Sequence, residues 1–154
     1  DKLPFKDGEL DLVTMIRVMH HLPDPTPTFA ELSRVLAKDG TLILEVANSL
    51  HFKSRIKAAA KLKRVSKAPI ERRSETNIKE ESIAFVNHHP KVVSDQLEAA
   101  GFKVEKILSV SNLRSPGIKK FIPGKTMIRI ERILQPTLAR LYFGPSVFFR
   151  VRKK

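Results

Sequence analysis

Apolar residues in this chain gather in short runs separated by turn-forming residues. Residues 10–17 (LDLVTMIR) form a nearly continuous apolar run, preceded by the turn signal Lys6-Asp7-Gly8. Residues 41–47 (TLILEVA) form a second run of the same kind. Such runs are typical of strands covered on both faces, as in a parallel sheet. They predict two neighbouring buried strands.

The segment between these runs predicts a helix. Its apolar residues recur at helical spacing: Phe29, Leu32, Val35 and Leu36. Thr26 or Thr28 is expected to cap the helix, with Glu31 in its first turn. Lys38-Asp39-Gly40 is expected to end it, with Gly40 as the left-handed residue. Strand, helix and strand joined by short loops predict a βαβ unit with parallel strands.

A second helix and two further strands are predicted downstream. The helix starts near Pro90, carries Val93, Leu97 and Ala100 on its inner face, and stops at Gly101. Residues 102–110 and 146–152 follow the pattern of strands. These elements extend the predicted α/β architecture to the carboxyl end of the chain.

Two segments interrupt this pattern and are predicted to be helical insertions that cover the end of the sheet. Residues 49–82 are rich in Lys and Arg, place Phe52 and Ile56 on one helical face, and include a polar stretch, residues 66–76, expected to form a loop. Residues 115–144 keep helical spacing, but Pro136 should kink or split that helix.

Composition restricts the classes of chemistry that the chain can perform. Its 154 residues are 42% apolar, which is enough for one domain with a hydrophobic core. The absence of Cys excludes disulfides, thiolate metal sites and a Cys nucleophile, and it fits a reducing compartment, so we expect a cytoplasmic protein. No apolar run approaches the length of a membrane span, and no signal peptide opens the chain.

Positive charge is concentrated downstream of the βαβ unit. The net charge is +13, yet residues 1–48 hold five basic and eight acidic groups. Residues 49–82 hold ten basic and four acidic groups, and residues 83–154 hold fourteen and four. A basic surface favours an anionic partner such as a phosphorylated substrate, an anionic membrane or nucleic acid. A solvated surface balanced by sequence outside this chain is the alternative explanation.

The order and spacing of several segments resemble the class I S-adenosylmethionine-dependent methyltransferases, in particular their methyltransferase type 11-like domain. The tightest similarity lies in LPFKDGELDLV (residues 3–13), VMHHLPDP (18–25) and ELSRVLAKDGTLILEV (31–46). Looser similarity continues through HHPKVVSDQLEAAGFKVEKI (88–107) and GPSVFFRVRKK (144–154). The resemblance implies a partial Rossmann-like sheet with strands four to seven of the family, the last of them antiparallel.

The resemblance also implies that residues 1–154 form a single domain truncated at its amino end. The family's first three strands, its Gly-rich loop that holds the methionine part of the cofactor, and its ribose-binding acid have no counterpart here. No G-x-G-x-G sequence occurs in the chain. We therefore expect the chain alone to bind the cofactor poorly and to be inactive. We also expect its first strand, a central strand in the family, to lack a pairing neighbour on one side.

The resemblance implies cofactor-binding positions at three places. Asp1, Lys2 and Leu3 correspond to the adenine side, although Asp1 is equally explained as a solvated loop acid. Ile16 and Arg17 correspond to the loop whose backbone contacts the amino-acid end of the cofactor. His21, in the same loop, is a candidate for packing on the cofactor side.

Substrate and catalytic positions are expected at the carboxyl ends of the strands, where ligands of open α/β sheets bind. Arg17 could hold an acidic substrate group, or it could be a surface residue whose stem packs along the sheet. Asn48 and His51 follow the second strand and are predicted substrate residues. His20 or His21 could act as a general base, with a structural role as the alternative. No metal site is expected, because adjacent histidines converge poorly on one ion.

Two activities are compatible with these features. The first is methyl transfer from S-adenosylmethionine to an unknown small-molecule acceptor by the whole protein, with possible peripheral contact to an anionic membrane. The alternative is a basic module that binds nucleic acid or an anionic membrane without catalysis. The aromatic residues are not interleaved with the basic ones as stacking platforms require, which disfavours nucleic acid. An inactive remnant is the third possibility.

Overall fold

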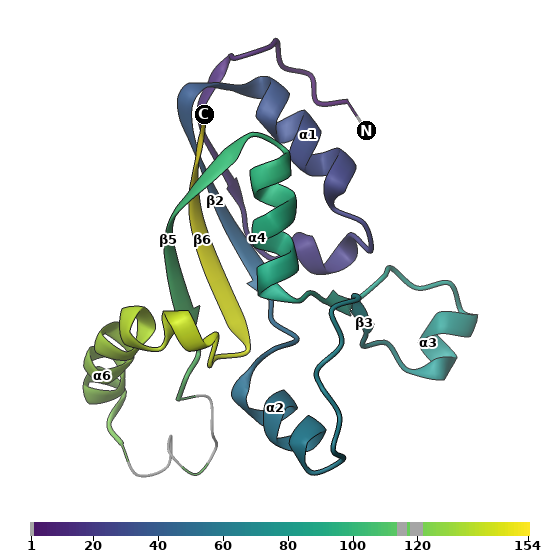
Figure 1. Cartoon of the computed structure of the whole chain (residues 1–154), viewed down its shortest axis with the longest axis vertical. Coiled ribbons are helices and arrows are strands. Elements are labelled where there is room, and N and C mark those ends of the chain that lie inside the picture. The colour runs from purple at the N-terminus through teal and green to yellow at the C-terminus, as the bar shows by residue number, and fades with distance from the viewer. Residues whose placement is uncertain (1, 114–116, 118–121) are drawn as a thin grey trace.

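The computed structural model describes residues 2–113, 117 and 122–154. It is an α/β structure built on a sheet of four strands in the order β1-β2-β6-β5. Helices α1 and α4 pack beside one another along this sheet, whereas the remaining helices lie toward one end of it (Figure 1). The strands of the sheet are β1 (Leu10–Met15), β2 (Leu36–Ala47), β5 (Phe102–Val110) and β6 (Ser146–Lys153).

The strand directions confirm the predicted sheet. β1 pairs with β2 in parallel, and the helix α1 (Thr26–Val35) connects them. β6 pairs antiparallel with both β2 and β5. Therefore β1, β2 and β5 run in one direction, and their carboxyl ends meet at the same edge of the sheet. The last strand is the antiparallel one, as the resemblance implied.

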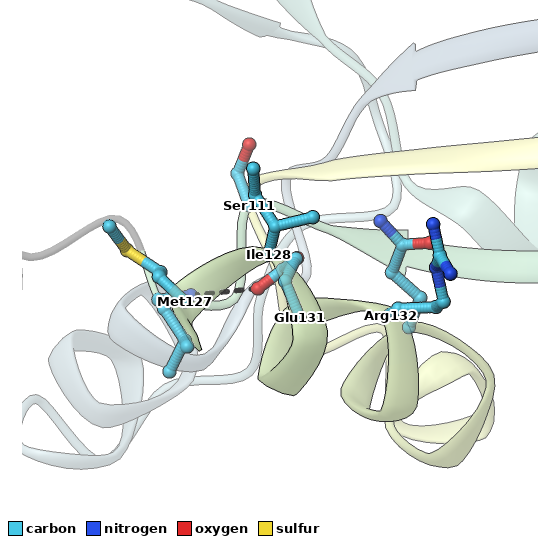
Figure 2. Close-up of a pocket in the computed structure, with 7 residues that line it drawn as sticks. Ser111, Met127, Ile128, Glu131 and Arg132 are labelled. Atoms are coloured by element: carbon cyan, nitrogen blue, oxygen red, sulfur yellow. Dashed lines mark hydrogen bonds between the residues drawn. The ribbon is translucent and has the colours of Figure 1, made fainter. Parts of the chain in front are cut away.

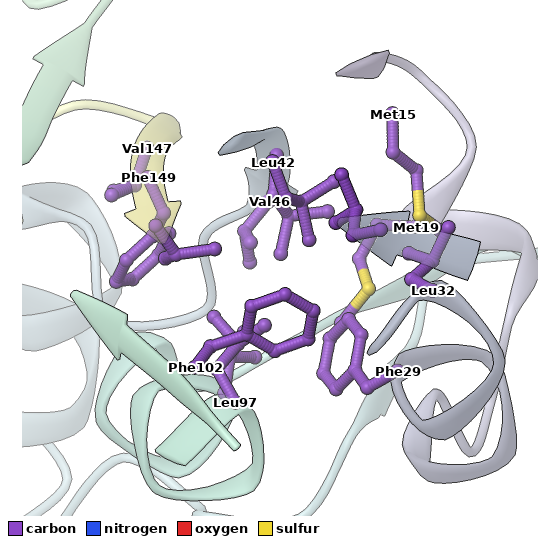
Figure 3. Packing of buried hydrophobic residues seen from close by; sticks show 14 residues of the cluster. Met15, Met19, Phe29, Leu32, Leu42, Val46, Leu97, Phe102, Val147 and Phe149 are labelled. Carbon is purple, nitrogen blue, oxygen red and sulfur yellow. The ribbon is translucent and has the colours of Figure 1, made fainter. Parts of the chain in front are cut away.

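The core lies between one face of the sheet and the two helices α1 and α4 (Pro90–Ala99). β2 alternates buried and half-buried residues from Gly40 to Ala47, as expected for a strand with one covered face. Figure 3 shows the side chains of the sheet meeting those of the helices. The largest fully buried side chains of this cluster are Phe29, Phe102, Phe149, Met19, Leu42, Leu44 and Leu97.

The predicted N-cap residue of α1 is wrong. Neither Thr26 nor Thr28 caps the helix, because Pro25 occupies the N-cap position and Thr26 is already the first helical residue. The Asp24 carboxylate accepts a hydrogen bond from the Thr26 amide at 3.0 Å and satisfies it instead. Glu31 consequently lies beyond the first turn, which holds no acidic residue.

The end of α1 also differs from the prediction. The helix stops at Val35, and Leu36 is the first residue of β2, so Lys38-Asp39-Gly40 lies within that strand. Asp39, not Gly40, has the left-handed backbone, with φ of 62°. Gly40 is required for space, because a Cβ there would lie 2.8 Å from the Ala37 carbonyl oxygen.

β1 is not covered on both faces as its apolar run suggested. It is the edge strand of the sheet, and it pairs only with β2 in the described part of the chain. Leu12 points away from the core and is 59% exposed, whereas Met15 is buried. An apolar run therefore did not distinguish a strand with two covered faces from one with a single covered face.

The two predicted insertions hold most of the other elements. Residues 49–82 contain α2 (Phe52–Ala59), the short strand β3 (Ile70–Glu71) and α3 (Glu75–Lys79), so the expected loop at 66–76 is interrupted by β3. β3 pairs antiparallel with β4 (Val86–Asn87). Residues 114–116 and 118–121 of the second segment lie outside the described residues. There α6 (Gly124–Thr137) contains Pro136 in its last turn and ends one residue later.

Candidate functional site

The carboxyl ends of β1 and β2 lie side by side, since Met15 pairs with Leu44. Two short segments follow them: the 3₁₀ turn η1 (Met19–His21) after β1, and Asn48 to His51 before α2. A third segment, residues 84–88, packs between them, because Asn48 and His88 form a parallel bridge. These three segments form the candidate site.

The second residue after β1, Arg17, has a strained backbone. Arg17 has φ of 59°, a left-handed conformation that is rare for a residue with a side chain. Its amide donates to the Glu45 carboxylate at 3.1 Å, and the Ser146 hydroxyl donates to the other oxygen of that carboxylate at 2.6 Å. Glu45 thus ties the end of β1 to β2 and β6. Ile16 and Val18, which flank Arg17, are each nearly half exposed.

The two histidines of η1 have different surroundings. The His20 ring lies over Phe85, with 4.6 Å between ring centroids, and burial together with His21 lowers the pKa of His20. The His21 Nδ1 lies 2.8 Å from the Ala84 carbonyl oxygen. A carbonyl oxygen only accepts, so His21 Nδ1 carries the proton and the neutral ring keeps a lone pair on Nε2. His21 is exposed, and its Nε2 is therefore a suitable proton acceptor.

His88 serves the architecture of this site. It is buried, and its Nε2 donates to the Met19 carbonyl oxygen at 3.3 Å. Its backbone amide donates to the Ala47 carbonyl and its carbonyl accepts from the Ser49 amide. Burial lowers the pKa of His88, which keeps the ring neutral near pH 7. His88 thus joins η1 to the end of β2.

Asn48 is fully buried, and its side chain is occupied by the chain itself. Its Nδ2 donates to the carbonyl oxygens of Tyr142 and Gly144, both at 2.7 Å, and its Oδ1 accepts from the Leu50 amide at 2.8 Å. These contacts describe a structural amide. The substrate role expected from its position stays a prediction, without support from these bonds.

His51 stands at the start of α2. It is the N-cap, its Nδ1 accepts from the Ser54 amide at 3.4 Å, and its Nε2 lies 2.9 Å from the Ser54 hydroxyl. Burial, Arg72 and Lys53 lower its pKa. His51 also lines a cavity of about 310 Å³ at the carboxyl ends of β2 and β5.

Apart from His51, the residues that line this cavity were not among the predicted site residues. It is lined by His51, Phe52, Ser111, Asn112, Phe143 and Pro145. Phe52 and Phe143 stack with 4.7 Å between their centroids. Phe143 and Asn112 come from loops with no local sequence signal, so only the strand order brings them to this edge. Glu45 had a signal, since it is an acidic residue within an apolar strand.

A second, larger cavity of about 550 Å³ adjoins the first through Ser111. It lies between α6 and the residues that follow β5 (Figure 2). Glu131 of α6 holds this arrangement, because its carboxylate accepts from the Asn112 and Leu113 amides at 3.0 and 3.3 Å. Met127 and Ile128 give the cavity an apolar wall.

Lys2 and Leu3 are not brought to the carboxyl ends of the strands. The Leu3 amide donates to Glu31 at 2.7 Å, and Arg34 donates to the Leu3 carbonyl at 3.3 Å. Arg34 lies at the opposite ends of β1 and β2, where Leu10 pairs with Leu36. Asp1 lies outside the described residues. The adenine-side assignment of these three residues stays a prediction.

Across residues 2–113, 117 and 122–154, no group of three His, Asp or Glu side chains is placed to hold a metal ion. No helix in the same ranges is long and apolar enough to cross a membrane.

Comparison with known proteins supports the resemblance found in the sequence. Residues 1–44 match a family model described as a methyltransferase domain. A search of curated proteins finds no match.

Solved structures match nearly the whole chain. A methyltransferase from Thermotoga maritima, described as a possible histamine N-methyltransferase, is 21% identical with a TM-score of 0.58, over 99% of this chain and 60% of that one. One from Mesorhizobium loti is 14% identical with a TM-score of 0.55, over 99% and 66%. The [4+2]-cyclase SpnF is 15% identical with a TM-score of 0.55, over 99% and 53%.

These findings agree on the fold and on its extent. The chain has the α/β fold of a class I S-adenosylmethionine-dependent methyltransferase domain, and it spans about three fifths of the first solved structure it matches. Similarity at this level carries the fold alone. SpnF illustrates the limit, because its name describes a cyclase on the same scaffold.

Proposed function

We propose that this chain is the carboxyl part of a methyltransferase domain that transfers a methyl group from S-adenosylmethionine to a small-molecule acceptor. In this proposal, residues 1–154 form one domain truncated at its amino end. Residues 49–82 and 115–144 cover the acceptor. The observation that carries the proposal is the strained turn at Arg17, held by Glu45 between two exposed apolar side chains at the carboxyl end of β1.

This turn fits one side of the cofactor. Ile16 and Val18 offer apolar surface that would exclude water from a bound ligand, and the backbone at Arg17 is fixed by its bond to Glu45. The cofactor, when bound, supplies a methyl group already activated by its sulfonium, so the protein needs alignment more than acid or nucleophile. The Gly-rich loop and the ribose acid of the family have no counterpart in this chain.

The acceptor side is proposed to use the two histidines and the adjoining cavity. The Nε2 of His21 would take the proton from an acceptor hydroxyl or amine, since its Nδ1 is occupied by the Ala84 carbonyl. Arg17, whose side chain is exposed, would hold an acidic group of the acceptor. His51 would border the acceptor in the cavity next to Phe52 and Phe143.

An NMR titration with S-adenosylhomocysteine tests this proposal. In the domain extended by its upstream strands, the amide signals of Ile16, Arg17 and Val18 should shift on binding. The amide of Lys103, near the start of β5 and the amino edge of the sheet, should not shift and serves as an internal control. Shifts confined to other regions, with Arg17 unchanged, would reject this turn as part of the cofactor site.

A further inference from the structure

A basic cavity of about 490 Å³ lies between α2, the segment that follows it and the start of α4. Among the described residues that line it there are five Lys and Arg side chains and no carboxylate. Its charged and titratable residues are Arg55, Lys63, Arg64, Lys67, Lys91 and His89. We refer to this feature as the basic cavity.

Within the described residues, no ion pair neutralises the positive charge of the basic cavity. Arg55 donates from Nε to the Leu50 carbonyl at 2.9 Å and from its terminal nitrogen to the Leu141 carbonyl. These acceptors fix the guanidinium without cancelling its charge. No ion pair within 4.0 Å joins the cavity's Lys and Arg side chains to a carboxylate of the described residues.

His89 provides a second, independent observation. It is only 7% exposed, it lines the basic cavity, and its Nδ1 has no hydrogen-bond partner in the part of the chain that the structure describes. A buried polar atom without a partner costs free energy, which a ligand can recover. His89 is also the N-cap of the ten-residue helix α4, so the positive end of that helix dipole lies at the cavity wall.

The electrostatics at His89 agree with an anion site. Burial and the cations Lys67, Lys91 and Arg55 lower its pKa, whereas the carboxylate of Asp95 opposes them. A bound anion would reverse the effect of these cations. Protonation of His89 would then become easier as the site fills.

We propose that the basic cavity binds a phosphate monoester group. Cations reach the cavity from α2, from residues 63–67 and from α4, and this distribution suits a tetrahedral dianion better than a planar carboxylate. Arg64, Lys67 and Lys91 hold the phosphate oxygens, and His89 lies in the wall of the site. This proposal does not depend on methyl transfer.

The other side of α2 has a second cavity, and its apolar lining suits an apolar part of the same phosphate-bearing ligand. A cavity of about 410 Å³ lies there, lined by Phe52, Ile56, Leu141 and Phe143 together with Arg55 and Ala59. Arg55 and Ala59 also line the basic cavity, so the two cavities adjoin across the helix. The phosphate can therefore belong either to a lipid headgroup or to a water-soluble ester.

Two charge-matched double variants test the proposal in the whole protein without cofactor. Arg64→Gln with Lys67→Gln removes two cavity cations, whereas Lys57→Gln with Lys61→Gln removes two exposed cations of the same segment that do not line it. The probes are glycerol 3-phosphate and vesicles of phosphatidylcholine containing phosphatidic acid. The first pair should weaken binding by about tenfold or more, the loss expected for charge-assisted hydrogen bonds, and the second by less than about twofold.

The pKa of His89, followed by NMR of its imidazole, should rise when glycerol 3-phosphate saturates the protein. Binding of the soluble ester alone assigns a free phosphate ester, and binding of vesicles as well assigns a lipid headgroup. Equal weakening by both double variants, an unresponsive His89 or no binding of either probe would overturn the proposal. Since no cofactor is present, each of these results is independent of the proposed methyl transfer.

Discussion

The histidines of the candidate site show how one residue type takes different roles through its neighbours. His21 has its Nδ1 against a carbonyl and its ring exposed, whereas His88 is buried with its Nε2 on the Met19 carbonyl. The sequence selected His21 as a candidate base but could not predict the surroundings of either ring. The distinction depends on residues more than sixty positions apart in the chain, Ala84 for His21 and Met19 for His88.

The tautomers of these two rings follow from their acceptors. We predict that neutral His21 carries its proton on Nδ1 and that neutral His88 carries its proton on Nε2. Long-range ¹H–¹⁵N correlation spectra at about pH 8, above the ordinary His pKa, distinguish the two forms directly. A His21 protonated on Nε2 would remove the basis for assigning it as the proton acceptor.

Asn48 was also a predicted site residue, but its contacts indicate a structural role. Replacing it by Ala leaves the carbonyls of Tyr142 and Gly144 buried without donors, so we predict a loss of about 2–4 kcal/mol in the free energy of unfolding. Urea denaturation measures this loss. Asn87→Ala is the matched control, since the Asn87 side chain is half-buried and should cost less than about 1 kcal/mol.

An effect of Asn48→Ala no larger than that of the control would contradict the structural role. The contacts of Asn48 then could not account for its burial. In that case the substrate role predicted from its position would be the better explanation.

At the scale of elements, the hydrophobic pattern predicted the type and order of the main helices and strands. It located β5 and β6 within one residue at each end, because their apolar positions and flanking turns are local signals. It misplaced the boundary between α1 and β2, since Leu36 continues the helical spacing yet pairs with Leu10. Tertiary pairing decided that boundary, and sequence periodicity could not.

The candidate site was predictable only in part for the same reason. The strand ends at Ile16–Arg17 and Asn48–His51 follow from parallel pairing, which the βαβ pattern implies. The contribution of residues 84–88 and of Phe143 depends on long-range packing. Sequence spacing carries no information about such contacts when no alignment of relatives constrains them.

The junction between η1 and β4 should depend on pH. Burial lowers the pKa of His88 below its ordinary value of 6.5, so the unfolded chain binds a proton more readily than the folded one. Stability is therefore fully present above about pH 6.5 and is lost as the pH falls toward the folded pKa. The pKa values of His20, His51 and His89 are lowered as well, so their contributions have the same sign.

We predict that the urea midpoint falls between about pH 7.5 and pH 5.5, and that His88→Gln makes this fall smaller. Lys57→Gln, an exposed lysine that stays charged over this range, should leave the dependence unchanged. A midpoint that rises on acidification would contradict the assignment of these histidines as neutral in the folded chain.

At the scale of the whole molecule, the charged residues are distributed unevenly along the chain. The first 48 residues hold five basic and eight acidic groups, whereas the excess of basic groups lies downstream, in residues 49–82 and in the segments that follow them, including β5 and β6. The proposed phosphate site lies in those segments, between α2 and α4. In the proposed function, the sheet would position the cofactor, and the covering segments would determine which acceptor or surface the protein meets.

The edge position of β1 belongs to this scale as well. Leu12 is exposed, and β1 has a partner on one side only in the described residues. The solved structures that match the chain are longer, and the chain covers 60% of the first of them. This arrangement is the physical basis for proposing that the chain supplies only one side of the cofactor site.

The most direct measurement is calorimetric titration of S-adenosylhomocysteine into two proteins. One is the 154-residue chain, and the other is the same chain extended by the residues encoded upstream of it. We predict binding by the extended protein and at least about hundredfold weaker binding by the chain alone, because most of the cofactor's polar contacts would be missing. Equal affinity in both proteins would contradict the shared site, and no binding by either would contradict the methyltransferase function.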